Sequence, residues 1–302
     1  MNTASQWRAT LARQVAPSYA ANPHVAAVLL GGSTARGHAD RYSDIELGVF
    51  WHQPPTDAER QAVANQIPGD LVRLYPYDPA EEVWSDDFLL GRRQPGLPRS
   101  GVLLEVVHYT TDFLNRTFDA VLQHANPDPL KQNLLAGVVQ GVPLHHPELV
   151  HHWKARAANY PDDLAIAVVN RYALIDHFWR WEMWLARSSN LMQLYHAYAQ
   201  VQQQILHVLL GLNRVYYFGF KWIDVVAAQL HFKPDNLVDR LSRVYQVAPA
   251  EGARELTALV EETYTLVEQQ LPQVNVSWLR SVFHYRRPIW DQAPPTASEI
   301  AQ

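Results

Sequence analysis

The most constraining feature of the sequence is residues 25–50, where a glycine-rich turn separates two strand-like runs. The first run, Val25 to Leu30, is apolar throughout, as in a strand buried on both faces. Gly31-Gly32-Ser33 follows directly, and glycine allows both a sharp turn and close approach of a ligand to the backbone. We expect Ser33 to cap a short helix, with free N–H groups that point at whatever lies over the turn.

The second run, Asp44 to Val49, alternates polar and apolar residues. Residues two apart share one face of a strand, so Asp44 and Glu46 should lie side by side while Ile45 and Leu47 face the core. Two adjacent carboxylates repel each other unless a cation lies between them. Magnesium prefers carboxylates together with phosphate oxygens, so the pair indicates a Mg²⁺ site beside a phosphate-binding turn.

A third acid, Glu105, lies in the apolar run Leu103 to Val107. The ordered set of strand, Gly31-Gly32-Ser33, acid pair and third acid resembles the signature of the polymerase-beta-like nucleotidyltransferase superfamily. Two-domain members of it include the aminoglycoside and lincosamide nucleotidyltransferases. By contrast, His108 is an odd number of residues from Glu105 and should face the other way.

The resemblance implies a Mg²⁺-dependent enzyme that moves a nucleoside monophosphate, usually AMP, from a nucleoside triphosphate to a hydroxyl of a small molecule. Asp44 and Glu46 would hold one or two Mg²⁺ ions, and Glu105 would be a third ligand or the general base. Gly31, Gly32 and Ser33 would cradle the phosphates, with a charge contact from Arg36.

A second segment, Leu212 to Trp222, joins two predicted helices and is aromatic, with Arg214 and Lys221 as its cations. It is similar to a joint in bacterial nucleotidyltransferase-like proteins with helical C-terminal domains. Lys221 could therefore contact the triphosphate or the acceptor. The alternative is a hydrophobic clamp between two helices that leaves the lysine in solvent.

The order of elements predicts an α+β protein with two domains. Residues 1–126 should form a mixed-sheet nucleotidyltransferase domain, residues 127–292 an all-α helical bundle, and residues 293–302 a disordered tail. Residues 76–100 are rich in Pro, Gly, Asp and Arg, so we expect a long loop or hairpin there. Its Arg92, Arg93 and Arg99 either contact phosphates or lie in solvent.

One long helix is expected from Asp162 to Ser188, with an apolar stripe along one side. Its aromatic residues are typical of a core, but Trp181 and Trp184 lie off the stripe and could stack on a ligand. Asp176 and Glu182 of the same helix either bind a cationic acceptor or pair with neighbouring arginines.

Composition and charge limit the classes of function and the cellular locations to be expected. The 302 residues carry a formal net charge of −5 with scattered basic residues, which argues against broad nucleic-acid binding. There is no cysteine, no signal-peptide pattern and no apolar run of membrane-spanning length, so a cytoplasmic location is expected. A non-catalytic nucleotide-binding regulator and transfer to a protein acceptor stay open, as do the acceptor's identity and the oligomeric state.

Overall fold

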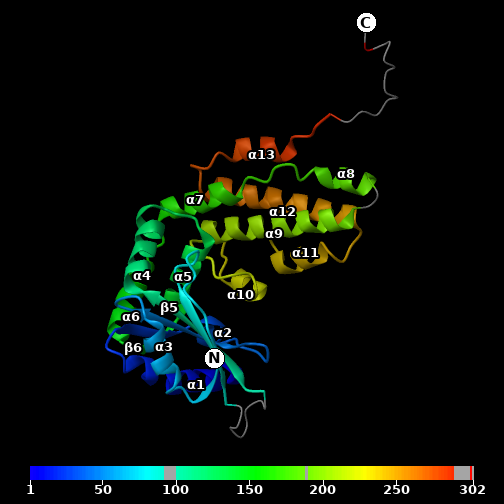
Figure 1. Cartoon of the computed structure of the whole chain (residues 1–302). Coiled ribbons are helices and arrows are strands. Elements are labelled where there is room, and N and C mark those ends of the chain that lie inside the picture. The colour runs from blue at the N-terminus through cyan, green and yellow to red at the C-terminus, as the bar shows by residue number, and fades with distance from the viewer. Residues whose placement is uncertain (92–99, 188–189, 289–299, 301–302) are drawn as a thin grey trace. The chain divides into compact units, whose positions relative to one another are not determined.

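The computed structural model describes residues 1–91, 100–187, 190–288 and 300 and divides into two compact units (Figure 1). The first unit contains Met1–Ala167 and Arg214–Lys221, and the second contains Val168–Asn213 and Trp222–Gln302. A six-stranded mixed sheet with helices forms the first unit, and the second is helical. The predicted α+β class is therefore confirmed.

The sheet has the strand order β3-β4-β5-β2-β1-β6. Neighbouring strands β2 and β5 are parallel, and every other pair is antiparallel. The strands are β1 (Val25–Leu30), β2 (Ile45–Trp51), β3 (Gly69–Leu74), β4 (Trp84–Leu90), β5 (Val102–Thr110) and β6 (Val142–His145).

One face of the sheet is apolar and packs against α1 (Thr3–Ala20) and α3 (Asp57–Ala64). Every second residue of β2 and β5 points into this core, and both strands show an alternating pattern of burial. Thr56 and Glu59 form the capping box that starts α3. The alternation that predicted β2 and β5 thus reflects burial of one face of each strand.

The remaining helices of the first unit do not all lie on one side: the helix after β1 packs its Ala35 against the apolar core, whereas two others contact the opposite face of the sheet. The remaining helices are α2 (Gly32–Arg36), α4 (Thr111–Phe118) with a following π-helix (Asp119–Gln123), α5 (Pro129–Gln140), α6 (Pro147–Ala157) and the start of α7 (Asp162–Tyr172). Phe50 of β2 contacts Trp153 of α6, with ring centroids 4.9 Å apart. Tyr109 at the end of β5 stacks on Phe113 of α4. Helices therefore contact this face where β2 and β5 end, while Glu46 and Glu105 lie nearer the strand starts.

The first unit does not end at residue 126, where the sequence placed a domain boundary. Strand β6 lies beyond that point and pairs with β1 at the edge of the sheet. The turn at Asn126 to Pro129 suggested a boundary, but a chain can return to the sheet after such a turn.

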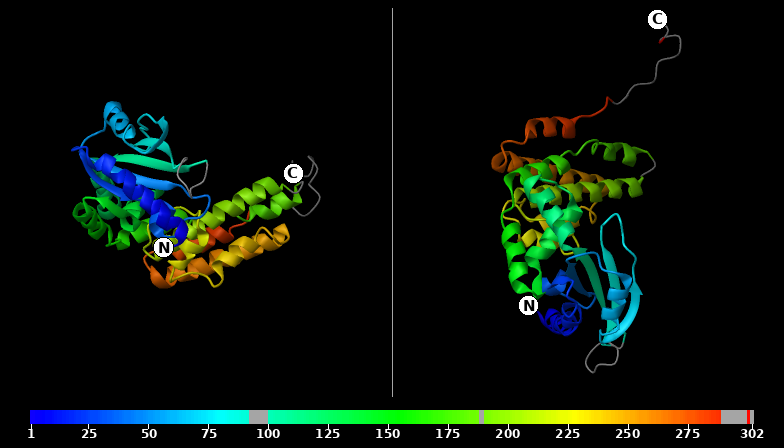
Figure 2. Two further views of the ribbon diagram at one scale, coloured as in Figure 1. Left: turned by 90° about the horizontal axis from the view of Figure 1, so that it is seen from below. Right: turned by 60° about the vertical axis from the view of Figure 1, so that its left-hand side comes forward.

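The second unit contains α8 (Arg180–Ala186), α9 (Leu191–Leu212), α10 (Ile223–Ala228), α11 (Leu237–Arg243), α12 (Pro249–Gln270) and α13 (Val276–His284). Figures 1 and 2 show its two longest helices, α9 and α12, side by side. The Tyr198 hydroxyl of α9 donates a hydrogen bond to the Pro249 carbonyl of α12. No helix in the described part of the chain is long and apolar enough to cross a membrane.

The expected single helix from Asp162 to Ser188 is wrong. It is interrupted between α7 and α8, where His177 has a φ of 58°. The carbonyl groups released by the break are bonded from other helices: Gln204 donates to Leu174 O at 2.9 Å, and Tyr264 donates to Ala173 O at 2.7 Å. These tertiary bonds compensate for the lost helical ones, and a periodic pattern in sequence does not reveal them.

The segment 76–100 contains a full strand, β4, rather than only a loop or hairpin. Residues 92–99, with Arg92, Arg93 and Arg99, lie outside the described residues. The expected disorder of residues 293–302 likewise falls, apart from residue 300, outside them.

Candidate functional site

The glycine turn contacts the acid pair directly. The Gly31 N–H donates a 2.8 Å hydrogen bond to the Glu46 carbonyl. Gly32 has a φ of +60°, and a Cβ added there would lie 2.2 Å from Glu46 Oε1. The left-handed backbone conformation favours glycine here, and an added side chain would also require the Glu46 carboxylate to move.

The predicted cap at Ser33 is wrong. Helix α2 begins with Gly31 as its N-cap, and Ser33 lies buried inside the helix. The next residue, Thr34, donates a 3.3 Å hydrogen bond from its hydroxyl to the Asp44 carbonyl. Ser33 therefore follows the glycine turn directly in the chain, but its hydroxyl makes no capping hydrogen bond.

A buried arginine holds the backbone that leads to Asp44. Arg8 of α1 donates from Nε and Nη2 to the Ser43 carbonyl, at 3.0 and 2.7 Å. With the bond from Thr34, this gives the half-buried Asp44 two tertiary supports at the start of β2. Such supports restrict the backbone and so pre-organise the side chain it carries.

Three carboxylates form a row across neighbouring strands. Glu46 of β2 is aligned with Glu105 of β5, and Glu105 is aligned with Asp87 of β4. All three are half-buried and lie on the face opposite the apolar core. Asp44 precedes β2 by one residue and acts electrostatically on both Glu46 and Glu105.

Burial and neighbouring acids raise the pKa values of Glu46 and Glu105. Burial raises the pKa of Glu46, and the charge of Asp44 adds to this, while Arg36 and Lys221 oppose it. Burial also raises the pKa of Glu105, with further contributions from Asp44, Asp87 and Glu46. Clustered acids of this kind are a common sign of a functional site, because a fold gains no stability from repulsion.

Arg36 lies half-buried at the end of α2. Its Nη1 donates a 3.0 Å hydrogen bond to Gln140 Oε1, and its guanidinium lies 5.4 Å from the centre of the Phe218 ring. Its Nε atom is buried and has no hydrogen-bond partner. Burial lowers the pKa of Arg36, and the charge of Glu46 opposes that shift. An unsatisfied buried N–H of a cation is costly, and an anion would satisfy it.

Lys221 reaches the site from a distant part of the chain. The segment 214–221 belongs to the first unit, where the Tyr216 hydroxyl donates to the Ala157 carbonyl at 3.0 Å. Lys221 itself is exposed, and its charge opposes the rise in the pKa values of Glu46 and Glu105. Its ammonium has no hydrogen bond or ion pair with another described residue. The structure therefore brings Lys221 near the acids.

Sequence reasoning missed Asp87 and its partner Tyr75. The Tyr75 hydroxyl donates a 3.1 Å hydrogen bond to Asp87 Oδ2, and this bond raises the pKa of Tyr75. In the structure Asp86 is buried and Asp87 half-buried on the other face, but the sequence of residues 83–90 shows no polar–apolar alternation that would indicate this. Two consecutive acids, Asp86 and Asp87, point to opposite faces of β4, and only Asp87 faces the site.

The other acid, Asp86, lies on the buried face with His108. Asp86 accepts a hydrogen bond from Arg60, and His108 Nε2 lies 2.7 Å from Asp86 Oδ2. The Trp51 indole N–H donates to His108 Nδ1 at 3.1 Å. The prediction that His108 faces away from Glu105 is therefore confirmed.

The carboxylates are the type of ligand that Mg²⁺ prefers, but three of them are not gathered at one point. Carboxylate oxygens are the ligands that Mg²⁺ prefers, and one or two of them suffice when phosphate oxygens and waters complete the shell. Among the residues that the structure describes, no group of three or more His, Cys, Asp or Glu side chains is placed to hold a metal ion. Asp44, Glu46 and Glu105 therefore do not form a ready-made three-ligand site.

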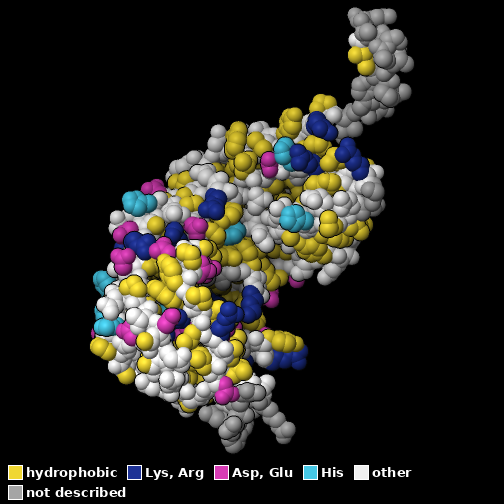
Figure 3. Space-filling model, in the orientation of Figure 1, with side chains coloured by type: hydrophobic (Ala, Val, Ile, Leu, Met, Phe, Trp, Pro, Cys, Tyr) yellow, Lys and Arg dark blue, Asp and Glu magenta, His cyan; other side chains and the backbone are white. Residues whose placement is uncertain are grey.

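Figure 3 shows one face of the molecule, on which basic and acidic side chains are interspersed among hydrophobic ones. Among the described residues visible there, basic side chains do not merge into one broad patch. Nucleic-acid binding usually needs such a patch.

Comparison with known proteins gives a family match to part of the chain and several matches among solved structures. Residues 129–223, from α5 through the segment that carries Lys221, match a family described as a domain of unknown function (DUF4037). The chain is similar, at 12% identity and a TM-score of 0.36, to a nucleotidyltransferase-like protein from Exiguobacterium sibiricum 255-15. That similarity covers 87% of this chain and 77% of the other. No curated protein matches the chain.

Proposed function

We propose that the first unit is a nucleotidyltransferase that uses a nucleoside triphosphate, with ATP as the expected donor, and a hydroxyl of a small molecule as acceptor. The observation that carries this proposal is the row of acids in contact with the glycine turn. Glu46 of the row touches Gly32 of the turn, so an acid cluster and a close-approach backbone site occur together.

The chain offers two cations to the phosphates. The unsatisfied Nε of Arg36 and the exposed ammonium of Lys221 both lie near enough to Glu46 to influence its pKa. Gly31, Gly32 and Ser33 supply backbone at a position that a ligand can approach closely. Charge-assisted hydrogen bonds to phosphate are about twice as strong as neutral ones, so these two side chains should dominate the affinity.

Asp44 and Glu46 are the residues that would hold Mg²⁺, and Glu105 is aligned with Glu46 on the next strand. When bound, the ion would neutralise charge that develops on the phosphate oxygens. Since three ligands are not already gathered, we expect metal and nucleotide to bind together rather than the metal alone.

In the proposed reaction the acceptor oxygen attacks the α-phosphorus and forms a new P–O bond. The bond from the α-phosphorus to the bridging oxygen breaks, and pyrophosphate leaves with those electrons. Glu105 would take the proton from the attacking hydroxyl. Its raised pKa makes its carboxylate a stronger base, which favours proton transfer. The alternative role of Glu105 is that of a third metal ligand.

The test is calorimetric titration of the full chain with ATP, GTP, CTP and UTP, with and without Mg²⁺, followed by assays of pyrophosphate release with candidate acceptors. Asp44→Asn should abolish pyrophosphate release, and Lys221→Ala should weaken nucleotide binding by about tenfold. Matched controls are Glu148→Gln and Arg13→Ala, which remove the same charges at exposed positions of the first unit. Both controls should behave as the wild type.

Two results would contradict parts of this proposal. If no nucleotide produces heat in either condition, the site assignment is wrong. If a nucleotide binds but no acceptor, small molecule or protein, supports pyrophosphate release, the protein is a non-catalytic nucleotide-binding regulator. The observation that favours this alternative is that no three acids among the described residues are placed to hold a metal ion.

A further inference from the structure

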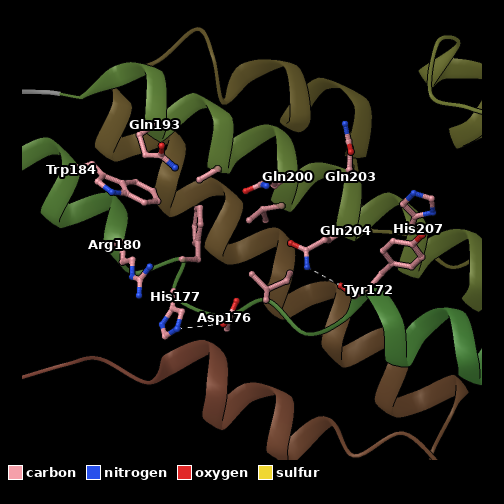
Figure 4. A pocket seen from close by; sticks show the side chains of 14 residues that line it. Tyr172, Asp176, His177, Arg180, Trp184, Gln193, Gln200, Gln203, Gln204 and His207 are labelled. Carbon is pink, nitrogen blue, oxygen red and sulfur yellow. Dashed lines mark hydrogen bonds and ion pairs between the residues drawn. The ribbon is translucent and has the colours of Figure 1, made fainter. Parts of the chain in front are cut away.

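A pocket of about 480 Å³ opens in the second unit, between α9 and the segment that joins α7 to α8 (Figure 4). Its volume lies in the range of small-molecule sites. Every residue that lines it belongs to the second unit, so the pocket exists without any contribution from the acid row. The proposed transferase chemistry gives it no role.

One wall is a polar stripe along α9. The stripe consists of Gln193, Gln200, Gln204 and His207, which follow one another at intervals of seven, four and three residues and therefore lie on one helix face. Figure 4 shows Gln193 toward one end, His207 toward the other, and Gln200, Gln203 and Gln204 between them. From Gln193 to His207 the stripe is roughly 21 Å long, at 1.5 Å per residue.

The amides of this stripe have unused hydrogen-bonding capacity. Gln200 and Gln203 are exposed, and their side chains make no hydrogen bond within the described residues. Gln204 donates from Nε2 to the Tyr172 and Leu174 carbonyls, which leaves its Oε1 as an acceptor. Each amide carries both donors and an acceptor, so the wall suits groups that donate and accept at one atom.

Aromatic rings lie at both ends of the pocket, and its floor is apolar. Trp184 of α8 is near the Gln193 end. At the other end Tyr172 and His207 are stacked, with centroids 4.0 Å apart and planes inclined by 7°. The buried floor consists of Ile175, Phe178, Ala197 and Val201.

The charges of the pocket nearly cancel. Asp176 lies 3.4 Å from His177, and Arg180 is the one permanent cation among the lining residues. Burial, helped by the charge of Arg171, lowers the pKa of His207 to about 4. A polyphosphate would need several cations and a polyamine several free acids, and this pocket provides neither.

We propose that this pocket binds a short uncharged oligosaccharide or glycoside. Hydroxyl groups both donate and accept, as side-chain amides do, and the C–H faces of sugar rings pack on aromatic rings such as Trp184. A stripe of roughly 21 Å is far longer than one heterocyclic ring and fits two or three linked sugar rings. An apolar ligand would leave the amides without partners.

The experiment is calorimetric titration of the full chain with maltotriose, cellotriose and lactose, and with adenosine and a neutral glycine-rich peptide as rival probes. At least one saccharide should bind. The double variant Gln200→Leu/Gln203→Leu should weaken that binding by about tenfold or more, and Trp184→Ala should weaken it by about tenfold. Gln269→Leu, an exposed glutamine of α12, is the matched control and should bind as the wild type does.

This inference stands or falls apart from the proposed reaction, because Asp44→Asn should leave saccharide binding unchanged. Absence of heat with all three saccharides would overturn it, as would binding of adenosine or the peptide in their place. Equal weakening by Gln269→Leu would also overturn it, since the pocket amides would then have no specific role. Circular dichroism of each variant separates loss of binding from loss of folding.

Discussion

At the scale of single residues, Gly32 connects the turn to the acid row. It combines a positive φ with a carboxylate placed where a Cβ would lie. Gly219, in the segment that carries Lys221, has a similar φ of +83° but no atom within 4 Å of an added Cβ. Substitution of Gly219 should therefore cost backbone strain alone, whereas substitution of Gly32 should cost backbone strain and the displacement of Glu46.

We expect Gly219→Ala to lower the free energy of unfolding by about 1 kcal/mol, the strain of a left-handed conformation. Gly32→Ala should lower it further and should also weaken nucleotide binding, because the methyl group pushes the Glu46 carboxylate away. Urea denaturation measures the first effect and calorimetry the second. Equal losses of stability in the two variants, with binding intact, would show that Glu46 moves aside at no cost.

Some residues of the site could be predicted from sequence and others could not. Glu46 and Glu105 follow from alternation within a strand, because that pattern determines which face a side chain occupies. The alignment of Glu105 with Asp87 could not be predicted, since it depends on which strands pair and in which register. The contact between Arg36 and Gln140 joins residues far apart in the chain and has no local pattern.

At the scale of elements, the break between α7 and α8 shapes the pocket wall. Gln204 holds this break by donating from one amide nitrogen to two carbonyls, at 3.3 and 2.9 Å. The bond to the Tyr172 carbonyl is half-buried and the bond to the Leu174 carbonyl is exposed, so water can replace part of what the amide donates and the loss costs about 1 kcal/mol. The neighbouring Gln203 is exposed and holds no part of the backbone.

Gln204→Leu should therefore destabilise the protein by about 1 kcal/mol, and the amides of residues 173–177 should exchange faster with solvent. Hydrogen exchange followed by mass spectrometry reports both the site and the size of the effect. The matched variant Gln203→Leu should leave exchange in this segment unchanged. Similar exchange in both variants would mean that Tyr264 and local packing hold the break without Gln204.

Prediction from sequence also succeeded unevenly for whole elements. The apolar run of β1 and the alternating runs of β2 and β5 are local signals, so their existence could be predicted. Strand β4 begins among acids and turn-forming residues, and its partner strands determine its conformation more than its own composition does. The long helix was wrongly predicted to continue through residues 173–179 because its apolar periodicity is strong there. The hydrogen bonds from Gln204 and Tyr264 that stabilise the break are tertiary and leave no local pattern in the sequence.

At the scale of the molecule, the first unit is built from two separate parts of the chain. Residues 1–167 contain the sheet, and residues 214–221 return to it after α9. The return is held by Arg214, which donates to Asp162 Oδ1 at 2.6 Å, and by Tyr217 N–H, which donates to Gln132 Oε1 at 3.4 Å. A boundary drawn from one turn in the sequence cannot account for a unit of this kind.

The discontinuity predicts how fragments behave. A fragment of residues 1–126 lacks β6, so the edge of β1 is unpaired, and it lacks Trp153, so Phe50 loses its cover. An unpaired edge beside exposed apolar surface promotes aggregation. We expect this fragment to be insoluble or unfolded, as judged by gel filtration and circular dichroism.

A fragment that joins residues 1–167 to 214–221 through a Gly/Ser linker restores the whole first unit. The linker can be short, because Arg214 contacts Asp162 and residue 167 lies only about 8 Å further along α7. This fragment should be soluble, unfold cooperatively and bind nucleotide as the full chain does, whereas residues 1–167 alone should bind more weakly because Lys221 is missing. Equal nucleotide affinity with and without residues 214–221 would show that Lys221 does not contribute to nucleotide binding. A soluble, nucleotide-binding fragment of residues 1–126 would instead show that the sheet needs neither β6 nor the returning segment.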